Sequence, residues 1–183
     1  MPKPLLYVIA FCLMAGSAWA DALDDFAKAM AAGKAGNYQL AIDNYSKAID
    51  SGELTEDKLA ITFTHRGANY YKLGQHALAI EDHDQAIRLD SKLALAYHNR
   101  AIAYHQLEQI ERAIEDYDQA IGLDPKIPSA HMNRGSAFQY LGQYDRAIED
   151  YSVVIQLNPN YAKAYNRKAW LLATAPSDRD RNG

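Results

Sequence analysis

Apolar residues recur along most of the chain at intervals of three and four, the spacing that places side chains on one face of an α-helix. Residues 94–127 contain two such runs, separated by the short turn Leu107-Glu108-Gln109. The apolar positions are Tyr97, Ala101 and Tyr104 in the first run and Ala113, Ile114, Tyr117, Ala120 and Ile121 in the second. The segment therefore predicts two amphipathic helices joined by a turn.

This pair of runs is one copy of a unit that repeats every 34 residues. Moved forward by 34 positions, its pattern residues Tyr97, Arg100, Ala101, Tyr104, Ala113, Tyr117, Ala120 and Pro125 fall on His131, Arg134, Gly135, Phe138, Ala147, Tyr151, Val154 and Pro159. Moved back by the same distance, they fall on Phe63, Arg66, Gly67, Tyr70, Ala79, His83, Ala86 and Ser91. Because a helix hairpin of this size cannot bury its apolar stripe alone, the repetition predicts copies that stack on one another.

The repeated pattern is a large, a small and an aromatic residue, then alanine, aromatic and alanine, then proline. It resembles the tetratricopeptide repeat (TPR), whose period is also 34 residues, and the resemblance covers nearly all of the chain after residue 20. The resemblance implies an all-α fold, a right-handed solenoid of antiparallel helix hairpins with a C-terminal capping helix. Complete repeats are predicted at residues 60–93, 94–127 and 128–161.

The two ends of the array are predicted to be atypical, because a terminal repeat meets water on one side. Residues 21–52 form a degenerate first repeat, in which Asp25 takes the place of an aromatic residue or His. After it, Thr55 and the acidic residues that follow predict an early helix start. Residues 162–174 are predicted to form a capping helix or half repeat, and residues 175–183 a flexible tail.

Residues 1–20 have the layout of a secretory signal peptide. A short basic start precedes an apolar run at residues 5–15, and the small residues Ala18 and Ala20 form a cleavage site. The apolar run is too short for a typical membrane span. We therefore expect cleavage after Ala20 and a periplasmic or secreted mature protein without stable membrane insertion; an uncleaved anchor is the alternative.

Charge and motifs argue against several function classes. The net charge is −4 and the chain has no basic run, which speaks against a nucleic-acid partner. None of the common nucleophile, metalloprotease or phosphate-loop motifs is present, so neither enzyme activity nor a cofactor is predicted. His98 and His105 lie about 10 Å apart along one predicted helix, too far to share a metal ion. His65 could approach His98, but two histidines without a carboxylate make a weak metal site.

Charged residues also repeat in step with the helices. Arg66, Arg100 and Arg134 share one repeat position on the first helix, and Asp82, Asp116 and Asp150 share another on the second. Arginine and aspartate that recur together favour ion pairs inside each hairpin, and a basic stripe that binds a ligand is the alternative.

In the TPR family, the first helix of each hairpin lines a concave groove that holds an extended peptide or a partner's helix. Transferred by register, the resemblance predicts groove residues at His65, His98, Asn99, Ile102, Asn133, Ser136, Lys163 and Arg167. Some TPR domains clamp a C-terminal carboxylate, and Asn133, Lys163 and Arg167 match part of that clamp. His98 and Ile102 stand where a Lys and an Asn belong, so the resemblance implies only half of a carboxylate site.

The sequence thus predicts a non-enzymatic scaffold that binds a peptide or partner helix in its groove, with a protein partner that the sequence does not identify. The alternative is a TPR assembly factor that self-associates through its first repeat or through the apolar residues 170–172, forming a homo-oligomer.

Overall fold

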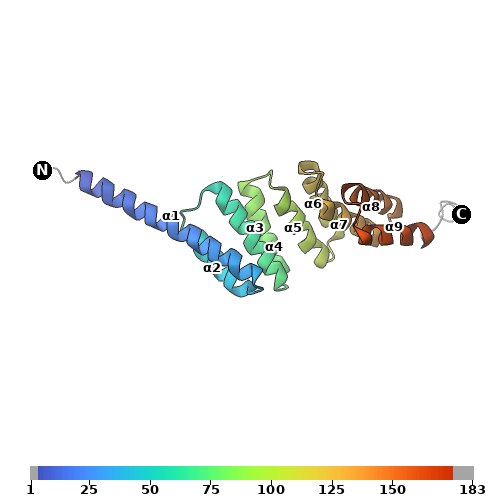
Figure 1. Ribbon diagram of the computed structural model, residues 1–183, viewed down its shortest axis with the longest axis horizontal. Helices are drawn as coiled ribbons and strands as arrows, with labels where there is room; N and C mark the ends of the chain where they lie inside the picture. The colour runs from blue at the N-terminus through green and yellow to red at the C-terminus, as the bar shows by residue number, and fades with distance from the viewer. Residues whose placement is uncertain (1–3, 175–183) are drawn as a thin grey trace. The chain divides into compact units, whose positions relative to one another are not determined.

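The computed structural model describes residues 4–174, with side chains from residue 19 onward. In this part of the chain every regular element is a helix, which confirms the all-α prediction (Figure 1). The helices are α1 (Pro4–Lys34), α2 (Tyr38–Asp50), α3 (Glu56–Lys72), α4 (His76–Leu89), α5 (Ala94–Gln106), α6 (Ile110–Leu123), α7 (Pro128–Tyr140), α8 (Tyr144–Leu157) and α9 (Ala162–Thr174). The predicted flexible tail, residues 175–183, lies outside the described residues.

The chain consists of two compact units, residues 1–99 and 100–183, whose boundary falls within α5. In the first unit, α1 packs against α2 and α3 packs against α4, while contacts between α2 and α3 join the two hairpins. In the second unit, α7 and α8 form a hairpin that contacts α6 through α7 and α9 through α8. Each unit is therefore a stack of helix hairpins.

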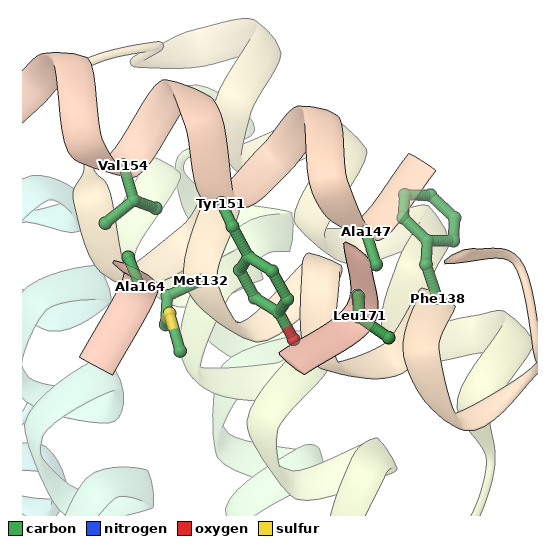
Figure 2. Packing of buried hydrophobic residues seen from close by; sticks show 7 residues of the cluster. All are labelled: Met132, Phe138, Ala147, Tyr151, Val154, Ala164 and Leu171. Atoms are coloured by element: carbon green, nitrogen blue, oxygen red, sulfur yellow. The ribbon is translucent and has the colours of Figure 1, made fainter. Parts of the chain in front are cut away.

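The helices bury alanine and aromatic side chains, as the apolar stripes predict. In the first unit the core around α1 and α2 consists of Ala29, Ala32, Ala41 and Tyr45, with Phe26 and Met30 packed against it. In the second unit the larger cluster is Met132, Phe138, Ala147, Tyr151, Val154, Ala164 and Leu171 (Figure 2). Tyr151 and Leu171 are fully buried there, so one face of α9 is part of this core.

The start of α3 confirms the early helix predicted after the first repeat. Thr55 has extended backbone angles and precedes the first helical residue, Glu56, and acidic residues occupy the first turn. A negative charge at this place interacts favourably with the unpaired N–H groups of a helix N-terminus.

The turns inside the hairpins need a left-handed backbone. Gly36, Gly74 and Gly142 have φ angles of +81°, +76° and +71° at corresponding places, and Glu108 has a φ of +58°. Glycine adopts this conformation without steric cost, whereas a residue with a Cβ does not. The third turn therefore stores backbone strain that the other three avoid.

The small residue in each first helix allows its partner helix to approach closely. A Cβ added to Gly135 would lie 2.8 Å from Cε1 and 3.1 Å from Cδ1 of Tyr151, and one added to Gly67 would lie 2.8 Å from Cε1 of His83. Ala101 occupies the same repeat position and is fully buried in a cluster with Tyr117. The packing between the two helices of this hairpin therefore accommodates one methyl group.

The repeated arginine and aspartate residues form ion pairs inside the hairpins. This is the arrangement that their recurrence in step favours. Each arginine donates from Nε and Nη2 to the two carboxylate oxygens of one aspartate. The paired distances are 2.8 and 2.7 Å for Arg66–Asp82, 2.7 and 2.6 Å for Arg100–Asp116, and 2.9 and 2.7 Å for Arg134–Asp150. Such two-point pairs fix the relative orientation of the helices more strictly than a single contact does.

Two of these aspartates differ in their electrostatic surroundings. Burial raises the pKa of Asp82 above its ordinary value, although Arg66 opposes this. Burial also acts on Asp150, but hydrogen bonds from His131 and Arg134 outweigh it and lower the pKa of that carboxyl. His131 Nδ1 lies 3.1 Å from Asp150 Oδ1, whereas the corresponding residue in the hairpin of Asp82 is Phe63, whose ring cannot donate a hydrogen bond. The contact from His131 explains the opposite directions of the two pKa shifts.

Candidate functional site

Two hollows lie along α1 and α3 in the first unit. One, of about 250 Å³, is lined by Leu23 and Phe26 of α1, Leu54 of the connecting loop, and Lys58 and Ile61 of α3. Its walls are almost entirely apolar, with the Lys58 side chain providing the charge. Four of its five lining residues are apolar, so the hollow suits a ligand that brings an apolar side chain.

The second hollow, also of about 250 Å³, lies nearer the C-terminal ends of the same two helices. It is lined by Met30, Gly33, Lys34, Tyr38, Tyr45, His65, Ala68, Asn69 and Lys72. Both hollows draw residues from α1 and α3, the first helices of two successive hairpins. The two hollows therefore belong to one surface, which we call the α1–α3 groove.

Three aromatic rings connect the two hollows. The Phe26 ring meets the Tyr45 ring edge to face, with centroids 5.5 Å apart, and His65 stacks on Tyr45 with centroids 6.0 Å apart and an interplanar angle of 9°. His65 also meets the edge of Phe26 at 5.9 Å. Edge-to-face and stacked ring contacts are favourable beyond the burial of their surface, so these three rings stabilise the floor of the groove.

Burial changes the acid–base properties of this floor. It raises the pKa of Tyr45 to about 12 and lowers the pKa of His65 below its ordinary value. Both rings are therefore uncharged near neutral pH, because burial disfavours the ionised form of each. The positive charge of the groove comes from the exposed side chains of Lys34, Lys58 and Lys72.

The second unit carries a polar cluster on α7, α8 and α9. The Tyr151 hydroxyl donates to Gln139 Oε1 at 2.9 Å, and Arg167 Nη1 approaches the same oxygen at 3.5 Å. Ser136 Oγ donates to the Met132 carbonyl at 3.0 Å and lies 3.4 Å from the Tyr151 hydroxyl. Gln139 thus links the predicted groove residues Ser136 and Arg167 through Tyr151.

The predicted groove residues lie in both units. His65, His98 and Asn99 belong to the first unit, and Ile102, Asn133, Ser136, Lys163 and Arg167 belong to the second. Lys163 and Arg167 are exposed, while Asn99, Ile102, Asn133, Ser136 and His65 are partly buried. These positions can contact a ligand only to the extent that their side chains reach the surface.

His98 requires a correction. Only 6% of its surface is exposed, so it does not line an open groove as predicted. Its repeat equivalents Thr64 and Met132 are also buried, at 2% and 3% exposure. In these three repeats the side chain at this position packs against other parts of the protein. The repeat register alone does not distinguish this buried position from the exposed positions beside it.

Leu23, Phe26 and Leu54 were not among the predicted site residues. The first repeat appeared degenerate because Asp25 occupies the aromatic position, so no groove register was extended to α1. The spacing of Leu23, Phe26 and Met30, at intervals of three and four, is the signal that would have found them.

Among residues 4–174, no group of three or more His, Cys, Asp or Glu side chains is arranged to hold a metal ion. Within the same described range, no helix has both the length and the apolar character needed to cross a membrane.

Comparison with known proteins identifies the repeats. A family model described as tetratricopeptide repeat matches residues 94–127 and 128–161, and one described as TPR repeat matches residues 67–108. No curated protein matches the chain significantly.

Solved structures share the fold. A crystal structure of MamA protein superposes with a TM-score of 0.73 at 23% identity, covering 84% of this chain and 81% of that chain. The second TPR domain of human RPAP3, in complex with the HSP70 peptide SGPTIEEVD, has a TM-score of 0.62 at 32% identity, covering 64% of this chain and 98% of that chain. The second TPR of Spaghetti (RPAP3), bound to the HSP90 peptide SRMEEVD, has a TM-score of 0.55 at 35% identity, covering 56% and 94%.

The repeat matches at residues 67–161 and the near-complete coverage of a TPR domain with 32% identity agree with the stacked hairpins and their 34-residue period. The chain belongs to the tetratricopeptide-repeat family.

Proposed function

We propose that the protein is a non-enzymatic, exported interaction module that binds an extended peptide carrying both apolar and acidic side chains. The observation that supports this proposal most directly is the α1–α3 groove, where apolar and aromatic walls are combined with Lys34, Lys58 and Lys72. Apolar hollows take apolar side chains, and lysines at their rims attract carboxylates.

The peptides in the RPAP3 structures have this chemistry. SRMEEVD and SGPTIEEVD each combine acidic residues with Met, Ile or Val. Those peptides bind RPAP3, and the likeness supports the same class of ligand for this chain, with a different natural partner.

The proposed binding energy comes mainly from the hollows. Burying one Met, Val or Leu side chain contributes about 1.5–3 kcal/mol. An exposed lysine–carboxylate pair contributes about 0.2–1 kcal/mol. The apolar anchors therefore supply most of the affinity, while the lysines select acidic sequences and decrease in effect as salt concentration rises.

The experiment that tests this proposal is a titration of the full chain with fluorescein-labelled SRMEEVD and its neutral analogue SRMQQVN, followed by anisotropy. We expect the acidic peptide to bind more tightly, and Lys58→Glu/Lys72→Glu to weaken it about tenfold or more. The matched control is Lys47→Glu/Lys92→Glu, which makes the same charge change at exposed sites outside the groove.

Equal affinity for the two peptides, or an equal loss in the control variant, would refute the lysine-lined groove as the site. Absence of binding for both peptides at millimolar concentration would refute this ligand class.

The proposed export rests on residues 1–20 and on the length of α1. This helix has 31 residues, whereas α5 and α7 have 13 each. Cleavage after Ala20 would leave Asp21–Lys34, which is close to the length of those two helices and retains the buried Ala22 and Ala29. The mass of the protein recovered from a periplasmic extract of a Gram-negative expression host tests the proposal; an intact N-terminus in that fraction or in the cytoplasm would contradict it.

A further inference from the structure

The connection between α2 and α3 is longer than the connections between later hairpins. Gly36 and Gly74, at corresponding turns, are 38 residues apart, whereas Glu108 and Gly142 follow at intervals of 34. Leu54 lies in this longer connection, residues 51–55, and forms one wall of the apolar hollow at the start of α1 and α3. This wall is therefore an addition to the repeat. We call the hollow the Leu54 hollow; its lining residues are Leu23, Phe26, Leu54, Lys58 and Ile61.

The size of the Leu54 hollow favours a large side chain. An apolar cavity of about 150 Å³ is large enough to bind benzene. At about 250 Å³, the Leu54 hollow has room for a substituted phenyl ring or an indole. A valine or methionine side chain, as in SRMEEVD, would leave part of this space unfilled, and the walls beside a gap lose their packing contacts.

Two neighbours favour an aromatic ring over an aliphatic side chain. The Phe26 ring lines the hollow and meets Tyr45 and His65 edge to face, at centroid distances of 5.5 and 5.9 Å. A ring bound in the hollow would extend this cluster, and aromatic pairs are stabilising beyond the area that they bury. Lys58 is the charged residue among the five that line the hollow, and it is exposed. An ammonium group is attracted to the negative face of a ring.

The lysines of the second hollow lie at a defined distance from the Leu54 hollow. Lys34 follows Phe26 by eight residues on α1. Lys72 follows Ile61 by eleven residues on α3. At about 1.5 Å per residue, these separations are about 12 and 16 Å along the helices. An extended peptide covers such a distance in about four or five residues, at about 3.3 Å each.

We propose that the Leu54 hollow binds an aromatic side chain of the peptide ligand, and that the acidic residues of this ligand lie four or five residues from the ring, at Lys34 and Lys72. The proposal rests on the peptide-binding function proposed above and goes beyond it, because it assigns the anchor residue and its distance from the acids. Leu54 and Ile61 then determine the specificity for the ring.

The probes are fluorescein-labelled, C-terminally amidated peptides titrated with the full chain and followed by anisotropy. GSWSSSEEGS and its reverse GSEESSSWGS place the acids four and five residues from the ring, in the two chain directions. In GSSSSWEEGS the ring adjoins the acids, and in GSLSSSEEGS and GSEESSSLGS leucine replaces it. We expect the better of the two spaced aromatic peptides to bind about tenfold more tightly than its leucine analogue and than GSSSSWEEGS.

Ile61→Ser tests the wall of the hollow. It should weaken binding of the spaced aromatic peptide about tenfold and abolish its advantage over the leucine analogue. The matched control is Leu78→Ser, since Ile61 and Leu78 are both 40% exposed and Leu78 lies on α4, outside both hollows. Circular dichroism establishes that both variants are folded.

Free indole tests the hollow without any peptide. Titrated into the full ¹⁵N-labelled chain, it should shift the amide signals of residues that line the Leu54 hollow, and Ile61→Ser should weaken this binding while Leu78→Ser leaves it unchanged. Absence of such shifts at millimolar indole would overturn the proposal.

The peptide results separate this proposal from the function on which it rests. If SRMEEVD binds but the spaced aromatic peptides have no advantage over their leucine analogues, or Ile61→Ser and Leu78→Ser cause equal losses, the aromatic anchor is wrong and the peptide-binding function stands. If indole binds in the hollow but none of the peptides binds, both are wrong, and the hollow is a site for a free aromatic molecule.

Discussion

Replacing Asp150 with Asn tests how much the ion pairs inside the hairpins contribute to stability. Asp150 is 2% exposed and accepts hydrogen bonds from Arg134 at 2.9 and 2.7 Å, with His131 Nδ1 at 3.1 Å. The amide keeps the shape of the side chain but removes its charge and places an NH₂ group against donors. Breaking a buried pair by removing one partner costs about 3–5 kcal/mol.

Two features of Arg134 reduce this cost. Its side chain is 21% exposed, and Nη1 retains Asp118 at 2.6 Å. We therefore expect Asp150→Asn to lower the free energy of unfolding by about 2–3 kcal/mol. Asp82→Asn should cost less, because burial raises the pKa of Asp82 and its ionised form is correspondingly less favourable.

The effect should depend on pH in a defined direction. The pKa of Asp150 lies below its ordinary value, so the ionised carboxylate stabilises the fold fully above about pH 4. That contribution is lost as the pH falls below this value and through the folded-state pKa. The difference between the native chain and Asp150→Asn should therefore be largest near pH 6 and shrink near pH 3.

Urea denaturation followed by circular dichroism, at both pH values, measures the difference. Glu149→Gln is the control, because it makes the same chemical change on the exposed neighbour. A loss at pH 6 no greater than that of Glu149→Gln, or a difference that does not shrink at pH 3, would refute the reasoning.

Three other changes have defined outcomes. Gly135→Ala should destabilise the fold by about 1 kcal/mol, since overpacking against Tyr151 exceeds the helix-propensity gain; a higher midpoint in urea would contradict this. Glu108→Gly should stabilise it by about 1 kcal/mol by relieving the positive φ, and an unchanged thermal midpoint would show the turn to be unstrained. Because burial lowers the pKa of His65, protonation opposes folding, so stability should fall as the pH drops below about 6.5, and His65→Phe should flatten that dependence in urea titrations.

Several structural features were predictable from individual residues because they repeat. The pairing of Arg66 with Asp82 followed from their recurrence in step. The small residue of the repeated pattern, Gly67 in one copy, marks the place where the partner helix approaches closely. The start of α3 followed from Thr55 and the acidic residues after it, because a helix N-terminus is stabilised by local interactions.

The candidate site was less predictable. His98 was assigned to the groove by register, yet it is buried, because positions one residue apart on a helix point about 100° apart and neighbouring helices cover one and not the next. Phe26 and Leu23 line the groove although the first repeat does not show the family pattern clearly. Leu23 and Phe26 line the groove together with residues of α3, which are far from them in the sequence.

The sequence by itself determined the helix hairpins, their 34-residue period and the ion pairs within them, because these depend on residues close together in the chain or repeated at one spacing. Only the tertiary structure decided which polar side chains are buried, where α1 and α3 leave hollows, and which face of α9 stays open. Burial and cavities depend on the packing of neighbouring helices against one another, and a one-dimensional pattern specifies a helix's apolar face without stating what covers it.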